Sequence, residues 1–290
     1  GFCSDGDIGF CIDNTCICSD DIPAGRIGPY SDIGASPLTG DTWVSAYAQS
    51  HGDLVVAHVL ADGRIADTTW EWVDGVPDVA PVVPGAMIRG GIDQAGDDVG
   101  MYTSIAVGSD GLPRVSYFDR EHASLRFATR AADGTWQKHD VDVGGGDVGV
   151  GGTVTGMYTS LGLRADGRPA IGYMAHVNQG GNLRAEVRYA VAASATPASP
   201  ADWTVLVVDT VALPALPEPD AFPLPRGLGL FVDMARDAME VPVLVYYDRQ
   251  NGDLYVADVG QSQYEEINVL PSDDAGRNAG RGVNLGWSRM

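Results

Sequence analysis

Positive charge is scarce in this sequence. Lys138 is the only lysine, and Lys and Arg together number 18 against 39 Asp and Glu, which gives a net charge of −21. An acidic surface repels phosphate backbones and anionic lipid headgroups. This balance disfavours nucleic acids and membrane surfaces as partners, whereas cations and neutral partners such as glycans stay compatible with it. A plain role in solubility, common among secreted proteins, explains the same charge.

Long hydrophobic runs and familiar catalytic motifs are also missing. A membrane-spanning helix needs about 20 consecutive apolar residues, and Gly, Pro or Asp interrupts the apolar stretches of this chain. The sequence contains no Gly-x-Ser-x-Gly elbow, no phosphate-binding loop and no His-Glu-x-x-His, and its five histidines are scattered. We therefore expect no membrane insertion, and the sequence assigns neither catalytic nor cofactor-binding residues.

Cysteine does not occur after residue 18. All four cysteines lie in a short polar segment, residues 1–21: Cys3, Cys11, Cys16 and Cys18. This segment is too polar to form a core, so we expect two disulfides, which imply an oxidising compartment and a secreted or cell-surface protein. Because Cys16 and Cys18 are too close to pair, each is expected to pair with Cys3 or Cys11. A zinc site is the alternative, although no Cys-x-x-Cys pair or nearby His supports it.

Glycine, in contrast, is abundant at 38 residues, and the chain contains a repeat. The string Gly-Met-Tyr-Thr-Ser occurs at residues 100–104 and again at 156–160, each time followed by an apolar strand, an Asp-Gly turn and a proline. Two further segments share the apolar pattern. The equivalent second strands are expected to carry Tyr47, Tyr117, Tyr173 and Tyr246, and the third strands to begin at Leu54, Leu125, Leu183 and Leu254.

Each repeated unit alternates apolar and polar residues with period 2 and contains hairpin turns, which is typical of antiparallel strands. Four strands over about 45 residues match the size of a β-propeller blade. The sequence thus predicts an all-β propeller over residues 29–290 that follows the Cys-rich segment. Its blades are expected at residues 29–76, 100–143, 156–210 and 227–270, with the start of a further blade at 280–290.

Two inserts separate these units. Residues 77–98 and the Pro-rich residues 212–227 are expected to cross an end of the propeller, where they either carry a binding function or seal one face. Residues 280–290 leave the ring incomplete, and open sheet edges need a partner. We expect the region around residues 22–30, another protein chain or further blades to close it. The start at Gly1, without Met or a signal peptide, predicts a processed, trimmed or incomplete N-terminus.

Acidic loops supply the candidate metal ligands. Calcium takes several oxygen ligands on a flexible turn. Candidate ligands lie in residues 93–98 and 140–149: Asp93, Asp97, Asp98, Asp140, Asp142 and Asp147. Neither stretch forms a complete ligand loop, and a solvated turn is the alternative interpretation of both.

The repeats resemble those of secreted bacterial β-propellers that carry Gly-x-Pro-x-[Ile/Val]-[Ser/Ala]-Tyr-x-Asp, over residues 29–270. Such repeats occur in adhesion, glycan-binding, scaffold and hydrolase proteins alike, so the resemblance implies the fold and little about function.

A shorter stretch, residues 252–287, resembles the glucose/sorbosone dehydrogenase family and its hedgehog-interacting relatives. The matching positions are Asp258, Val259, Gly260, Gln261, Glu265, Glu266, Ile267, Asn268, Asn284, Gly286 and Trp287. The family implies a six-bladed propeller, and some members oxidise sugars with pyrroloquinoline quinone and calcium. This chain departs from it, because the cofactor-binding Gly-x-Arg-Asn-Pro segment is absent and no pattern around His51, His58 or His122 matches the catalytic histidine.

The leading hypothesis is therefore an extracellular β-propeller that acts as a binding or structural module, within a larger assembly or with glycans as ligands. The alternative is a sugar dehydrogenase that depends on pyrroloquinoline quinone and calcium, or an inactive relative of one.

Overall fold

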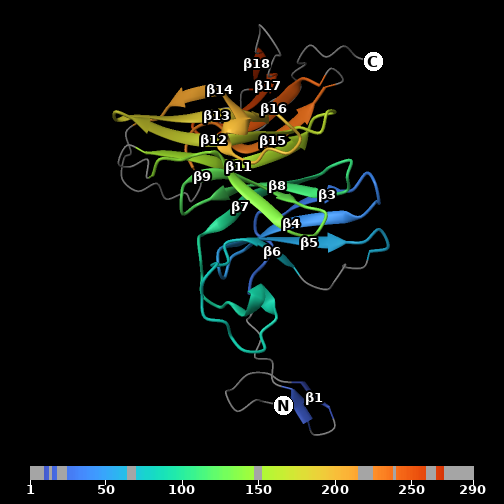
Figure 1. The fold of residues 1–290 in the computed structure, drawn as a ribbon. Helices are drawn as coiled ribbons and strands as arrows, with labels where there is room; N and C mark the ends of the chain where they lie inside the picture. Colours follow the sequence, from blue (N-terminus) through green and yellow to red (C-terminus); the bar gives the residue numbers. More distant parts are fainter. Residues whose placement is uncertain are drawn as a thin grey trace.

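The protein folds into four antiparallel sheets, each with four strands, which form the blades of a β-propeller (Figure 1). The computed structural model describes residues 10–12, 15–17, 25–63, 70–146, 152–214, 225–237, 240–258 and 266–270. Within them, no helix is long and apolar enough to cross a membrane. The prediction of an all-β propeller built from four-stranded antiparallel blades is confirmed.

The strands of each blade follow one another as a meander. Blade 1 contains β3 (Asp32–Ala35), β4 (Thr42–Ala48), β5 (Asp53–Val59) and β6 (Glu71–Asp74). Blade 2 contains β7 (Val99–Val107), β8 (Pro113–Asp119), β9 (Ser124–Arg130) and β10 (Trp136–Asp142). Blade 3 contains β11 (Thr153–Leu163), β12 (Pro169–Gln179), β13 (Asn182–Ala192) and β14 (Trp203–Ala212). Blade 4 contains β15 (Leu230–Arg236), β16 (Pro242–Asp248), β17 (Asp253–Asp258) and β18 (Glu266–Leu270).

Short elements outside the blades complete the described chain. A hairpin of β1 (Phe10–Ile12) and β2 (Thr15–Ile17) lies in the Cys-rich segment, and its register places Cys11 directly opposite Cys16. Cys3, Cys18 and residues 280–290 lie outside the described residues, so the predicted disulfides and the further blade stay predictions. Two short 3-10 helices, η2 (Ile88–Gly91) and η4 (Pro200–Asp202), lie in connections.

The blades pack in chain order (Figure 1). Strands β3, β4 and β5 contact β7, strands β7 and β8 contact β11, and strands β11 and β12 contact β15. Each junction encloses an apolar cluster; the first contains Leu54, Val56, Val99, Val115 and Tyr117. Burial of such faces is the main stabilising contribution in a stack of repeats, because one sheet cannot cover both of its own faces.

A glycine at the start of the inner strand in blades 2 and 3 allows this close packing. Gly100 and Gly156 have φ of +100° and +92°, and a Cβ at either position would lie 2.7 Å from the Cα of Leu54 or Leu125 in the preceding blade. No side chain fits at that distance, so the Gly of the Gly-Met-Tyr-Thr-Ser string is a contact point between blades.

Tyrosine–aspartate hydrogen bonds also join neighbouring blades. A hydroxyl on the second strand of one blade donates to a carboxylate on the outer strand of the blade before it. The three pairs are Tyr117 to Asp74 at 2.8 Å, Tyr173 to Asp142 at 2.6 Å, and Tyr246 to Asp209 at 2.7 Å. These three repeated tyrosines therefore have a structural role, since each joins its blade to the one before it.

The expected equivalence of the fourth tyrosine was wrong by one residue. The register pairs Tyr47 with Leu54 and Phe118 with Leu125, so Tyr47 corresponds to Phe118 and Ala46 takes the place of the bonded tyrosine. A one-residue difference in register cannot be recognised from an apolar strand alone, because apolar residues occupy both the expected position and the one next to it.

The third strand of blade 3 begins at Asn182, in agreement with its expected start at Leu183, but Leu183 is not the register equivalent of Leu125. Strand β13 begins four residues earlier than its match to Leu125 requires, and the residue at that register position is Val187 instead of Leu183. Because the hairpin of blade 3 is longer, matching the third strands by their first residues placed Leu183 opposite Leu125 in the sequence alignment.

The insert of residues 77–98 covers the face of blade 1 that points away from blade 2. Figure 1 shows this segment, with η2, on the side of β5 and β6 opposite to β7. Ala46 and Val55 point to that side and are fully buried, with Trp72 packed against them. Arg89 of η2 lies 5.6 Å from the Trp72 ring. Of the two roles predicted for this insert, the structure supports sealing one face.

Candidate ligand-binding site on the propeller axis

One aromatic side chain from each blade lies two residues after the repeated glycine. Tyr102, Tyr158 and Phe231 lie in the inner strands β7, β11 and β15, and Tyr30 lies in the turn that precedes β3. Neighbouring ring centroids are separated by 4.6 Å from Tyr30 to Tyr102, 4.4 Å from Tyr102 to Tyr158 and 5.1 Å from Tyr158 to Phe231. The four rings therefore form a continuous row across the blades, which we call the axial row. Its two ends are open to solvent, since Tyr30 is 43% and Phe231 57% exposed.

Every residue of the axial row has a left-handed backbone. Its members share φ between +51° and +55°: Tyr30, Tyr102, Tyr158 and Phe231. A side chain in this region strains the backbone by about 1–3 kcal/mol per residue, and such strain clusters at functional sites. Glycine would fit the same backbone without strain, so the aromatic side chains themselves must account for the choice of residue.

A cleft of about 480 Å³ adjoins the Tyr30 end of the row. It is lined by Arg26, Pro29, Tyr30, Tyr47, Gln49, Asp98, Met101 and Arg120. The Tyr47 hydroxyl donates to Asp98 Oδ1 at 2.8 Å, and Arg120 Nη1 donates to Asp98 Oδ2 at 3.0 Å. Blade 1 supplies Tyr47, the end of the insert supplies Asp98, and the turn after β8 supplies Arg120.

Two tyrosine hydroxyls are held in the protonated form here, that of Tyr47 in the cleft and that of Tyr102 beside Tyr30 in the axial row. Burial, followed by the hydrogen bond to Asp98, raises the pKa of Tyr47 far above its usual range. Burial and the neighbouring hydroxyls of Tyr158 and Tyr30 do the same to Tyr102. Neutral hydroxyls, a carboxylate and a guanidinium beside an aromatic face can bind a polar ring.

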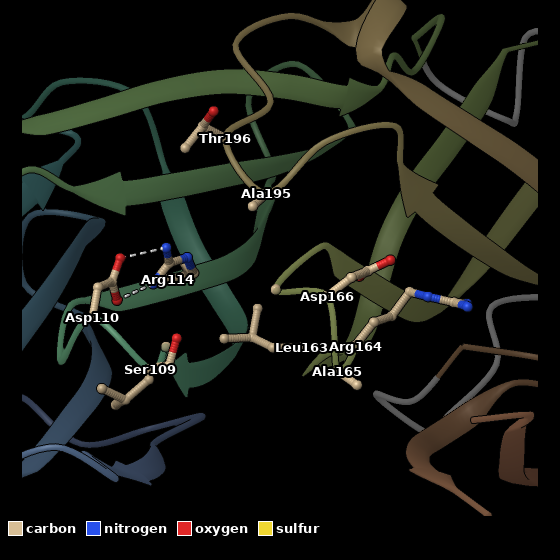
Figure 2. A pocket seen from close by; sticks show the side chains of 12 residues that line it. Ser109, Asp110, Arg114, Leu163, Arg164, Ala165, Asp166, Ala195 and Thr196 are labelled. Carbon is tan, nitrogen blue, oxygen red and sulfur yellow. Dashed lines mark hydrogen bonds and ion pairs between the residues drawn. The ribbon is translucent and has the colours of Figure 1, made fainter. Parts of the chain in front are cut away.

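A second cleft, of about 410 Å³, lies near the opposite end of β7, between the β7–β8 and β11–β12 turns (Figure 2). Two of its charged side chains pair with each other, because Arg114 donates to both oxygens of Asp110 at 2.9 and 2.8 Å. This contact lowers the pKa of Asp110, and the hydrogen bond from Arg168 lowers the pKa of Asp166. Two carboxylates that both stay ionised do not form an acid–base pair, so this cleft is a weaker candidate.

The carboxylates of the insert predicted to bind calcium are separately engaged. Asp93 Oδ1 lies 3.4 Å from His51 Nε2, and Asp98 is held in the axial cleft. Asp97 contributes to the raised pKa of His122, behind the larger effect of Asp119.

The candidate ligands of the other loop also meet cations. Asp140 Oδ1 lies 3.3 Å from Arg126 Nε, and Asp142 Oδ2 accepts from Arg188 Nη1 at 2.7 Å. Asp147 lies outside the described residues. Across the described part of the chain, no three His, Cys, Asp or Glu side chains gather closely enough to hold a metal ion. Calcium binding by these loops stays a prediction.

The histidines each have a hydrogen-bonding partner. The pairs are His51 with Asp93, His58 with Asp41, His122 with Asp119, His139 with Trp203, and His176 with the carbonyl of Arg226. Each of the five histidines therefore contributes to the internal hydrogen bonding of the described chain.

Sequence reasoning missed the axial row, although a signal for it exists. A glycine precedes an aromatic residue by two positions in every blade: Gly28 and Tyr30, Gly100 and Tyr102, Gly156 and Tyr158, Gly229 and Phe231. The repeat was aligned on its second strands, so the copies in blades 1 and 4 were not recognised as members of this pattern.

Comparison with known proteins shows likeness only at the level of structure. No protein-family model matches the chain, and neither does any curated protein. The resemblance to the glucose/sorbosone dehydrogenase family therefore stays a prediction.

Solved structures with a related fold include a puromycin hydrolase, at 14% identity and a TM-score of 0.47 over 87% of this chain and 33% of that one. An alpha-L-arabinofuranosidase from Fusarium graminearum has 13% identity and a TM-score of 0.46 over 90% of this chain and 67% of that one. A polysaccharide lyase has 10% identity and a TM-score of 0.47 over 86% and 50%. This chain spans about a third of the puromycin hydrolase.

The fold and the axial cleft thus define a class: a β-propeller whose inner strands present a strained row of aromatic rings beside a cleft with one carboxylate and two arginines.

Proposed function

We propose that this chain is an extracellular β-propeller binding module whose ligand is a neutral saccharide held in the cleft beside Tyr30. The observation that carries the proposal is the axial row, with a strained aromatic residue repeated at one position in all four blades. The open end of this row adjoins polar side chains that can bind hydroxyl groups.

The residues of the cleft fit a sugar ring. A sugar ring presents C–H groups on its faces, which pack against an aromatic ring such as Tyr30, and hydroxyls at its edge. Asp98 can accept from two vicinal hydroxyls, while Arg120 and Gln49 can donate to them. A mostly apolar surface with a few placed polar groups is the usual composition of a small-molecule site. The net charge of −21 disfavours acidic polysaccharides.

An extracellular location rests on the Cys-rich segment. Four cysteines in 18 residues and none elsewhere suit a disulfide-stapled region better than a cytosolic domain. Mass spectrometry without reduction tests this part, because two disulfides leave no thiol to alkylate. Free thiols or bound zinc would contradict it.

The ligand is tested by calorimetric titration with a panel of neutral and acidic oligosaccharides. Replacing Tyr30 with Gly removes the ring and suits φ of +55°, so the backbone is not strained further. We expect Tyr30→Gly to weaken binding at least tenfold, a loss of about 1.4 kcal/mol. Tyr30→Phe keeps the ring, removes only the hydroxyl and serves as the matched control, with binding within about threefold of the original.

Two results would overturn this proposal. One is that no neutral saccharide binds at millimolar concentration. The other is that Tyr30→Gly and Tyr30→Phe bind equally well.

A sugar dehydrogenase dependent on pyrroloquinoline quinone remains the alternative, supported by the resemblance of residues 252–287. The described residues do not fit that chemistry: the axial cleft contains no histidine, and no group of three metal-ligating side chains lies in the described chain. Much of the motif, including residues 259–265 and 271–287, falls outside it. Reconstitution with the quinone and Ca²⁺, followed by dye reduction on aldoses, tests this alternative; robust turnover would favour it.

A further inference from the structure

The axial row ends at blade 4 in an exposed aromatic ring that does not line the cleft beside Tyr30. Phe231 is 57% exposed, and its φ of +54° is as strained as that of the other three rings. Its ring centroid lies 5.1 Å from that of Tyr158, which is only 8% exposed. Backbone strain of this kind clusters at functional sites, so the exposed ring of Phe231 calls for a role of its own.

Each blade also carries a hydrogen-bonding side chain at one equivalent position. In blades 1, 2 and 4, the residue that follows the second strand donates its backbone N–H to the carbonyl two residues before the repeated glycine, at 2.8–3.0 Å. These donors are Gln49, Arg120 and Arg249. In blade 3 the register pairs His176 with Val154, which lies two residues before Gly156. One such side chain thus accompanies each ring of the axial row.

Two of these four side chains, Gln49 and Arg120, already belong to the cleft beside Tyr30. Arg249 is the counterpart of Arg120 in blade 4. It is held against the segment that leads into β15, because its N–H donates to Gly227 and its Nη1 donates to the Pro225 carbonyl at 3.4 Å. The blade 4 end of the row therefore repeats two components of the cleft: an exposed aromatic ring and an arginine from the turn after the second strand.

The spacing of the two exposed rings fits a ligand longer than one sugar ring. Neighbouring centroids in the row are separated by 4.4–5.1 Å, and the rings of Tyr102 and Tyr158 lie between Tyr30 and Phe231. A single sugar ring covers one aromatic ring and so reaches one end of the row. A linear oligosaccharide can place one unit on Tyr30 and another on Phe231, and each unit buries C–H surface against an aromatic face.

We propose that the saccharide site continues along the axial row to blade 4, where Phe231 and Arg249 form a second subsite. The ligand is then a linear neutral oligosaccharide that contacts both ends of the row. This inference rests on the proposed function, because it extends the site beside Tyr30. It adds a longer ligand and two residues that do not line the cleft.

The test is calorimetric titration with cello-, manno- and xylo-oligosaccharides of two to six units. In a series that binds, we expect the hexasaccharide to bind at least tenfold more tightly than the disaccharide. The overlapping disaccharide frames of a hexasaccharide account for only about fivefold. Phe231→Gly suits the left-handed backbone and should weaken hexasaccharide binding at least fivefold. It should change disaccharide binding less than twofold, because a disaccharide fills the cleft beside Tyr30, whereas Tyr30→Gly should weaken both.

Phe231→Tyr is the matched control. It keeps the ring and gives blade 4 the residue of the other three blades, so hexasaccharide binding should stay within about twofold. Arg249→Gln leaves the ring in place and introduces the side chain that blade 1 has at this position. It should weaken hexasaccharide binding at least threefold without affecting the disaccharide, and circular dichroism checks that each variant is folded.

Two results would overturn this inference and leave the proposed function standing. One is a hexasaccharide that binds no more than about fivefold more tightly than its disaccharide. The other is equal hexasaccharide binding by Phe231→Gly and Phe231→Tyr, or by Arg249→Gln and the original protein where Phe231→Gly does not fold. Absence of binding by every series would instead count against both.

Discussion

Replacing Arg89 with Ala should destabilise the propeller more than any surface change, because the insert is anchored by a buried ion pair. Arg89 Nε and Nη2 donate to the two carboxylate oxygens of Asp53 at 2.6 and 3.1 Å. Its Nη1 also donates to the carbonyls of Ile92 and Gln94. Both charged side chains are fully buried. The pair thus holds residues 77–98 on the outer face of blade 1.

Removing one partner of such a pair leaves the other charge buried and alone, which costs about 3–5 kcal/mol. Total domain stability is about 5–15 kcal/mol, so Arg89→Ala should lose a large fraction of it. The exposed pair of Arg120 and Asp98 is the matched comparison. Arg120 is 63% exposed, and breaking a surface pair costs at most about 1 kcal/mol, so Arg120→Ala should unfold almost like the original protein.

The loss from Arg89→Ala should also depend on pH. Burial raises the pKa of Asp53 from its ordinary value of 3.8, and Arg89 opposes the rise. Without Arg89 the folded-state pKa moves further up. A group with a raised folded pKa contributes stability that is full below the unfolded value and lost as the pH rises through the folded one. The deficit of the variant should therefore shrink as the solution is acidified from neutral pH.

Urea unfolding, followed by circular dichroism at several pH values, measures both effects. A double-mutant cycle with Asp53→Ala adds the coupling between the two residues. The double variant should be no less stable than Arg89→Ala, since neither charge is left alone. A loss below about 1 kcal/mol for Arg89→Ala at neutral pH, or a pH-independent loss, would refute the reasoning.

Two further predictions concern packing and pH. Gly156→Ala should be less stable than Gly146→Ala by about 1–3 kcal/mol in urea unfolding. The two glycines have similar φ, +92° and +96°, but only at Gly156 would a Cβ lie against Leu125. Equal losses of stability would show that Gly156 is required for its dihedral angle alone. The hydrogen bond to Asp119 raises the pKa of His122 above 6.5, so its contribution is full below 6.5 and fades as the pH rises through the folded pKa. His122→Gln should abolish that loss, as seen by thermal unfolding across pH 6–9; an unchanged pH profile would contradict the assignment.

The repeated pattern of strands and turns allowed the fold to be predicted. The candidate site could not be predicted in the same way, because it depends on contacts that this pattern does not contain. Alternation of apolar residues and Asp-Gly turns specify strands and hairpins locally, so four meanders could be inferred without any tertiary contact. Tyr47 shows that this local pattern does not determine the register of a strand. Its side chain lies in an apolar strand like Tyr117, yet only the pairing with Leu54 reveals that it is one position out of register.

The axial cleft depends on contacts that no local pattern contains. Asp98 looked like a calcium ligand because it ends an acidic stretch. In the structure it binds Tyr47, 51 residues away, and Arg120, 22 residues away. Arg89 anchors the insert on Asp53, the first residue of β5, where the sequence His-Gly-Asp resembles a solvated hairpin turn. Burial of a charge is a property of the fold, so sequence alone could not assign it.

The two end blades differ from the middle ones at the positions that hold blades together. In blades 1, 2 and 3 the outer strand presents Asp74, Asp142 or Asp209 to the tyrosine of the next blade. The register places Leu270 at the same position in blade 4, opposite Leu254. In blade 1 the tyrosine position is Ala46, on a face packed against Ile27, Trp70 and Trp72. A Tyr–Asp hydrogen bond therefore cannot join blade 4 to blade 1, because both the donor and the acceptor are replaced by apolar side chains.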